Sequence, residues 1–106
     1  MAIQHFTDDN FQEEVLNSSI PVLVDFFATW CGPCQQLAPI VEMLGAEYAG
    51  KIKIGKLDVD EANETASKYR VMSIPTLILF KDGEPIQTLV GFQTKEKLVA
   101  ELEKVA

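Results

Sequence analysis

Two cysteines, Cys31 and Cys34, are the only cysteines of the chain, and Gly32-Pro33 separates them. They follow an apolar stretch and precede a segment with helical periodicity, so they should lie at the start of a helix. Gly32 allows the turn to bend, and Pro33 suits a first helical turn, where a backbone N–H has no partner. Cysteines at i and i+3 in such a turn can close a disulfide and reopen it, which predicts a redox-active thiol pair.

The two cysteines should have different tasks. Cys31 would lie at the positive end of the helix dipole with free N–H donors directed at its sulfur, which favours the thiolate. The thiolate attacks disulfides, so Cys31 is the predicted nucleophile. Cys34, one turn further and more buried, is the predicted resolving thiol, which would release a mixed disulfide by attacking Cys31. A bridge closing so short a loop adds little stability, which favours a chemical role.

Two other interpretations of this pair remain. A C-x-x-C pair is half of a structural zinc site, but zinc needs four ligands and His5 is the only other soft candidate. Such a site would therefore have to be shared between chains. The pair could also be buried and idle. The position of the pair between an apolar strand and a helix favours redox chemistry, and we expect no metal.

The elements that must position these cysteines follow from the hydrophobic pattern. Residues 3–6, 22–28, 52–59, 76–80 and 86–90 are predicted strands, and residues 8–16, 34–48, 61–69 and a segment from about Thr94 are predicted helices. Asp82-Gly83 is a strong hairpin turn signal. The order β-α-β-α-β-α-β-β-α predicts an α/β fold with parallel strands joined by right-handed crossovers. The final hairpin should add an antiparallel edge.

Length, composition and charge restrict the function further. The chain has 106 residues, which fits one domain over 1–106, and its hydrophobic fraction of 47% is that of a globular protein. A net charge of −7 argues against nucleic acid and against anionic membranes as partners. No signal peptide and no apolar run long enough for a membrane helix is visible. We therefore expect a cytoplasmic protein.

The segment from Val24 to Cys34, VDFFATWCGPC, resembles the active-site segment of the thioredoxin family. The likeness continues through residues 56–60, 73–77, 80–83 and 90–92, in family order. It implies a thioredoxin fold, a central mixed five-stranded sheet flanked by four helices. It also implies a protein-disulfide reductase without a bound cofactor, whose partners are disulfide-containing clients and a thioredoxin reductase, either a flavoprotein or a ferredoxin-linked enzyme. We expect a monomer.

Two charged residues gain candidate roles beside the cysteines. Asp25 interrupts an apolar strand, and because ionising a buried carboxylate is costly, its acidity should be weakened. Such a group can exchange a proton with a thiol, and the resemblance assigns this exchange to Asp25 and Cys34. The alternative is a solvated strand end. Lys56 resembles the family lysine near this aspartate, although an ordinary surface lysine is equally compatible with the sequence.

Ile74-Pro75 resembles the family loop that faces the disulfide with a cis proline. Most X–Pro bonds are trans, so only the resemblance predicts cis for Pro75. A cis bond would bring the Ile74 backbone beside the site, where it could pair with an extended client segment. The implied client surface consists of Trp30, Ile74, Val90, Gly91 and Phe92, with ordinary core packing as the alternative for the aromatic residues.

Two other functions are compatible with the sequence. One differs in the direction of thiol–disulfide exchange and the other in the class of protein. An oxidase or isomerase would use the same chemistry in reverse, but its relatives tend to carry a His between the cysteines, where this chain has Gly32-Pro33. A redox-independent binding or scaffold subunit is the rival from another class. The cysteine pair would then be dispensable for the function.

Overall fold

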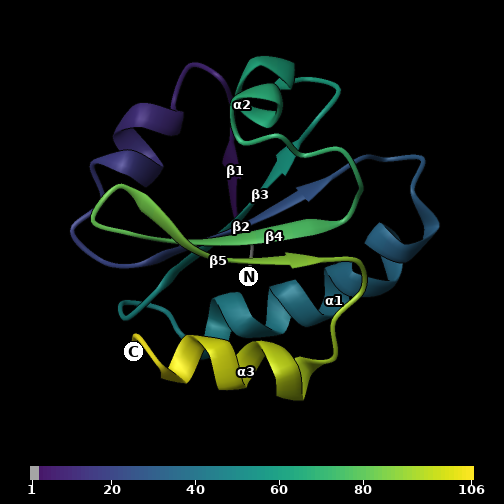
Figure 1. Cartoon of the computed structure of the whole chain (residues 1–106). Coiled ribbons are helices and arrows are strands. Elements are labelled where there is room, and N and C mark those ends of the chain that lie inside the picture. The colour runs from purple at the N-terminus through teal and green to yellow at the C-terminus, as the bar shows by residue number, and fades with distance from the viewer. Residues whose placement is uncertain (1–2) are drawn as a thin grey trace.

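The sheet of the computed structural model, which describes residues 3–106, has five strands in the order β1-β3-β2-β4-β5 (Figure 1). The strands are β1 (Gln4–Phe6), β2 (Val22–Phe27), β3 (Lys53–Asp58), β4 (Thr76–Lys81) and β5 (Glu84–Val90). The helices are α1 (Gly32–Glu47), α2 (Asn63–Lys68), α3 (Lys95–Glu103) and a short π-helical segment, η1 (Gln12–Leu16). This order confirms the predicted α/β fold with a mixed sheet and four helices.

The strands pair as the topology requires. β3 pairs in parallel with β1 and with β2, whereas β4 is antiparallel to β2, and β5 is antiparallel to β4. The hairpin between β4 and β5 turns at Asp82 and Gly83, which both have positive φ, 53° and 82°. Turns with two such residues match the twist of hairpin strands. The predicted antiparallel edge is therefore confirmed.

Two apolar clusters cover the two faces of the sheet, and successive side chains of β2 point alternately into one and the other. Val22, Val24 and Phe26 pack into the cluster beneath η1 and α2, while Leu23 packs into the cluster beneath α1 and α3. Figure 1 shows α1 and α3 side by side on one face of the sheet and α2 on the other. By the same alternation, Asp25 belongs to the α1 face.

One edge of the sheet collects the segments that carry candidate site residues. Phe26 of β2 pairs with Thr76 of β4, which pairs in turn with Val90 of β5. Phe27 of β2 pairs with Asp58 of β3. Because β2, β3 and β5 end where β4 begins, four loops meet at this edge.

Helix boundaries differ from the sequence prediction. α1 begins at Gly32 rather than Cys34 because Pro33 needs no N–H partner and therefore fits inside the first turn. The first predicted helix, residues 8–16, is shorter and wider. The Asn17 N–H bonds the Gln12 carbonyl at 2.9 Å, a five-residue spacing that makes this segment a π-helix.

Gly55→Ala tests the close approach of β1 to β3. A Cβ on Gly55 would lie 2.6 Å from both the Gln4 carbonyl oxygen and the Phe6 ring, so β1 would have to shift. We expect a loss of about 2–3 kcal/mol of unfolding free energy in urea titrations. Gly32→Ala is the control, because nothing lies within 4 Å of a Cβ there. Equal stabilities of the two variants would contradict this account.

Candidate active site

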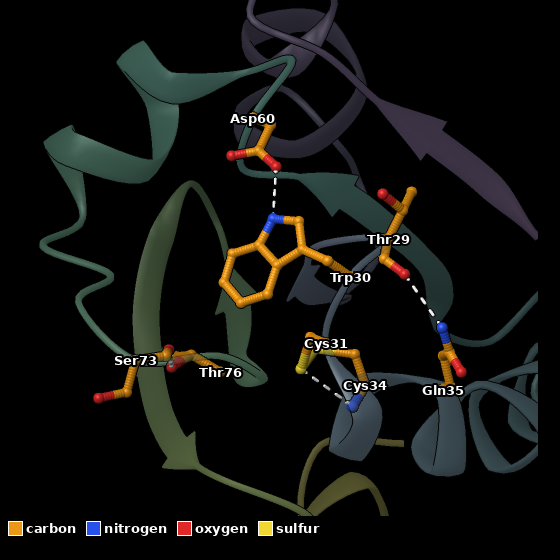
Figure 2. The surroundings of a disulfide bond; sticks show 8 residues. All are labelled: Thr29, Trp30, Cys31, Cys34, Gln35, Asp60, Ser73 and Thr76. Atoms are coloured by element: carbon orange, nitrogen blue, oxygen red, sulfur yellow. Dashed lines mark hydrogen bonds between the residues drawn. A yellow bond between two sulfur atoms is a disulfide. The ribbon is translucent and has the colours of Figure 1, made fainter.

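Cys31 and Cys34 form a disulfide at the N-terminus of α1 (Figure 2). Cys31 is the N-cap residue, with extended backbone, and its Sγ accepts a hydrogen bond from the Cys34 N–H at 3.2 Å. In the reduced protein the same N–H and the positive end of the helix would favour a negative charge on that sulfur. The geometry therefore distinguishes the two thiols and favours Cys31 as the thiolate.

Burial separates the two sulfur-bearing residues less than the sequence suggests. The exposed fractions are 5% for Cys31 and 3% for Cys34. Both pack with Ala28, which is buried, and with the half-buried Phe27 and Ile74. The residues between them, Gly32-Pro33, are exposed. The turn is therefore the part of the disulfide loop that solvent reaches.

The indole of Trp30 is exposed beside Cys31 and is held in place by Asp60. Its Nε1–H donates to Asp60 Oδ2 at 2.9 Å (Figure 2). Asp60 was not among the predicted site residues. A usable signal was available, since Asp60 follows β3, a strand predicted to run parallel to β2, and the carboxyl ends of parallel strands share an edge.

Asp25 lies in the middle of β2 with only 2% of its surface exposed, which excludes a solvated strand end. Among the described residues, its Oδ1 has no hydrogen-bond partner. Burial raises the pKa of Asp25 from its ordinary value of 3.8 to about 7, against the opposing charge of Lys56. The carboxyl can therefore gain or lose a proton near neutral pH.

Lys56 lies beside Asp25, because the two residues are direct partners in the β2–β3 register. Its Nζ is 5.0 Å from the centroid of the Phe27 ring. A cavity of about 120 Å³ lies where β2, β3 and α1 meet. Its walls include Phe27, Cys34, Gln35 and Lys56. Gln35 also donates through Nε2 to the Thr29 carbonyl at 3.0 Å (Figure 2). The structure thus brings Lys56 to the cysteines rather than leaving it on a remote surface.

The loops before β4 and after β5 border the disulfide on another side. The Ile74–Pro75 peptide bond is cis, which is the isomer that the resemblance implies. Gly91 has φ of +90° and donates its N–H to the Pro75 carbonyl at 2.7 Å, so the two loops are joined. Val90 and Phe92 flank it and are exposed, Phe92 by 44%, which excludes ordinary core packing for this ring.

Within residues 3–106, no group of three or more His, Cys, Asp or Glu side chains is arranged to hold a metal ion. None of the helices that the structure describes is both long and apolar enough to cross a membrane.

A disulfide that encloses only two residues constrains the unfolded chain little, and its exposed turn is open to a thiol or disulfide partner. Fold and site together define a thiol–disulfide oxidoreductase. Comparison with known proteins identifies the family within this class. The family model described as Thioredoxin matches residues 2–104.

The chain is 58% identical over 104 residues to a thioredoxin of Staphylococcus haemolyticus, and the match covers 98% of both chains. It is 57% identical to a thioredoxin of Staphylococcus saprophyticus and 58% identical to one of Staphylococcus aureus, with the same coverage. The chain belongs to the thioredoxin family.

Asp25→Asn should stabilise the fold at high pH. Because the folded pKa is raised, the folded state binds more protons than the unfolded state between pH 3.8 and about 7, so stability falls as pH rises through this window. A shift of this size corresponds to about 4 kcal/mol. Urea denaturation should show the variant more stable than the unsubstituted protein by several kcal/mol at pH 8, and the gain should nearly vanish at pH 4.

The control for this measurement is Glu61→Gln, which removes an exposed carboxylate. A gain for Asp25→Asn that is equal at pH 4 and pH 8 would show that ionisation of the buried carboxyl is not its cause.

Proposed function

We propose that the chain is a protein-disulfide reductase whose Cys31/Cys34 dithiol is regenerated by a thioredoxin reductase. One observation carries this proposal: the Cys34 N–H points at Cys31 Sγ at the start of α1. The buried carboxyl of Asp25 in β2, with its raised pKa, is consistent with it. This arrangement supports a stabilised thiolate at Cys31 and a proton acceptor for the second thiol. Membership of the thioredoxin family supports the same assignment.

In the first step, the Cys31 thiolate attacks one sulfur of a client disulfide. The new bond joins Cys31 Sγ to that sulfur, and the client S–S bond breaks with its electron pair on the departing client thiolate, which takes up a proton from solvent. Helix α1 supports this step because its first N–H groups favour negative charge at Cys31. Cys31 is the nucleophile in this assignment.

In the second step, Cys34 resolves the mixed disulfide. Its thiol gives up a proton to the Asp25 carboxylate, and the resulting thiolate attacks Cys31 Sγ, so that the second client thiolate leaves. A pKa of about 7 suits Asp25 to this transfer, because both protonation states are populated near neutral pH. Lys56, the register partner of Asp25, modulates the carboxyl through its charge.

Clients bind over the turn of Gly32-Pro33 on the apolar surface of Trp30, Ile74, Val90, Gly91 and Phe92. Within the described residues, neither the N–H nor the carbonyl of Ile74 makes a hydrogen bond. These groups are therefore free to pair with an extended client segment, as in strand addition. The Gly91–Pro75 hydrogen bond holds the two client-binding loops together.

The protein works as one domain over residues 1–106, as a cytoplasmic monomer that needs no bound cofactor and no nucleic acid or membrane. Its net charge of −7 supports the exclusion of polyanionic partners. Its partners are disulfide-containing client proteins and the reductase. A scaffold role that does not depend on redox chemistry would leave activity in a protein without either cysteine.

Substitution of the resolving thiol tests the mechanism. Cys34→Ser should accumulate a mixed disulfide with a protein client such as insulin, because Cys31 can attack but nothing releases the product. Cys31→Ser should accumulate much less, and the double variant none. Non-reducing electrophoresis and mass spectrometry after alkylation measure the adduct. Equal trapping by both single variants would refute the assignment of Cys31 as the nucleophile.

The direction of transfer is tested by a redox titration against a dithiol buffer, followed through the fluorescence of Trp30, the only tryptophan. A reductase should have a midpoint below the cytosolic glutathione poise, roughly −220 to −260 mV by extraction methods. A midpoint well above that range would indicate an oxidase or isomerase. The absence of any redox-linked change in fluorescence or alkylation would leave only the scaffold role.

A further inference from the structure

Met72 is the most exposed large apolar side chain that the structure describes, with an exposed fraction of 93%. It lies in the loop between α2 and β4, one of the segments that meet at the edge of the sheet that carries the disulfide. Within residues 3–106, its side chain belongs to none of the core clusters. A flexible, fully hydrated thioether at this place needs a physical reason.

The loop holds Met72 outward by anchoring the residues on either side. The Val71 N–H donates to the Ala66 carbonyl at 2.9 Å, and the Val71 side chain packs against the core. Thr76 donates through Oγ1 to the Ser73 carbonyl at 2.6 Å. Because both flanks are fixed, Met72 is exposed by the course of the backbone.

Met72 lies two residues before Ile74 in the loop that borders the disulfide. Ile74 packs against the cluster that contains Cys31 and Cys34, and the backbone from Met72 to Ile74 spans at most about 7 Å. Figure 2 shows Ser73, which follows Met72, on the loop to the left of Cys31. Met72 is therefore an exposed apolar side chain on a loop at the end of the sheet where Trp30, Val90 and Phe92 are also exposed.

We infer that Met72 contacts the bound client and that its oxidation by peroxide to the sulfoxide weakens client recognition. This inference rests on the proposed function. A methionine side chain adapts to different apolar partners, which suits a surface that meets many clients. The sulfoxide is polar, so it would disrupt an apolar contact without touching the cysteines.

The oxidation step is balanced by hydrogen peroxide alone. The thioether sulfur of Met72 attacks one peroxide oxygen and forms the S–O bond, while the O–O bond breaks with its electron pair on the second oxygen. The proton of the first oxygen passes to the second, which leaves as water. Sulfur is oxidised by two electrons and peroxide is reduced by two. While Cys31 and Cys34 form their disulfide, they have no thiolate to compete for the oxidant.

Met43 provides a matched control within the same chain. It is 44% exposed and lies on α1, nine positions beyond Cys34, so about 13 Å of helix separates the two residues. Its oxidation should not affect the client surface. Met43→Leu is therefore expected to behave like the unsubstituted protein in every assay below.

The test treats the disulfide form of the full chain with hydrogen peroxide, removes the oxidant and maps sulfoxides by peptide mass spectrometry. The kcat/KM for insulin reduction is then measured, together with the rate for the small disulfide dithiobis(nitrobenzoate), which is too small to cover the client surface. Treatment should lower kcat/KM for insulin about threefold to tenfold, mainly through KM, and leave the small-disulfide rate within about twofold. Met72→Leu should keep its own untreated kcat/KM after the same treatment.

Met72→Gln, which places a polar group of similar length at this position, should reproduce the KM effect without peroxide. The inference is wrong if Met72→Leu loses as much insulin activity on treatment as the unsubstituted protein, or if Met72→Gln and Met72→Leu have equal KM. If the proposed function itself is wrong, the result is distinguishable, because the untreated protein would then reduce neither insulin nor the small disulfide.

Discussion

The pairing of β2 on both sides is the constraint on which the site depends. β3 runs parallel to β2 and β4 runs antiparallel to it, so β2 and β3 end where β4 begins. The disulfide at the start of α1, the loop that ends in Pro75 and the loop that carries Asp60 are therefore neighbours, although they are far apart in sequence. Without this pairing, these three segments would not lie at the same end of the sheet.

Asp25 shows the energetic consequence of placing a carboxyl in a central strand. The carboxyl occupies a position that an apolar residue would fill with greater stability, and its Oδ1 has no partner among the described groups. Burial alone would disfavour the ionised form more strongly than it does here, because the charge of Lys56 opposes it. The strand pair β2–β3 thereby adjusts the acidity of this buried carboxyl.

The sequence predicted the element order and the cysteine site well, because hydrophobic periodicity and the spacing of Cys31 and Cys34 are local properties. It predicted the start of α1 less well, since whether Pro33 falls inside the first turn depends on the backbone of Cys31. Asp60 and Met72 were missed. Neither residue belongs to a recognisable motif. Asp60 could have been found only from its place after a strand parallel to β2, and Met72 only from its exposure in the folded chain.

The sequence by itself determined that two thiols would share one helix start and that a carboxylate would lie in a buried strand, because these follow from residue type and short-range geometry. The tertiary structure alone decided that Lys56 lies beside Asp25, that the Trp30 indole is held by Asp60, and that Phe92 lies on the surface and not in the core. These relations join residues from different elements, and strand register and loop anchoring fix them only when the sheet has formed.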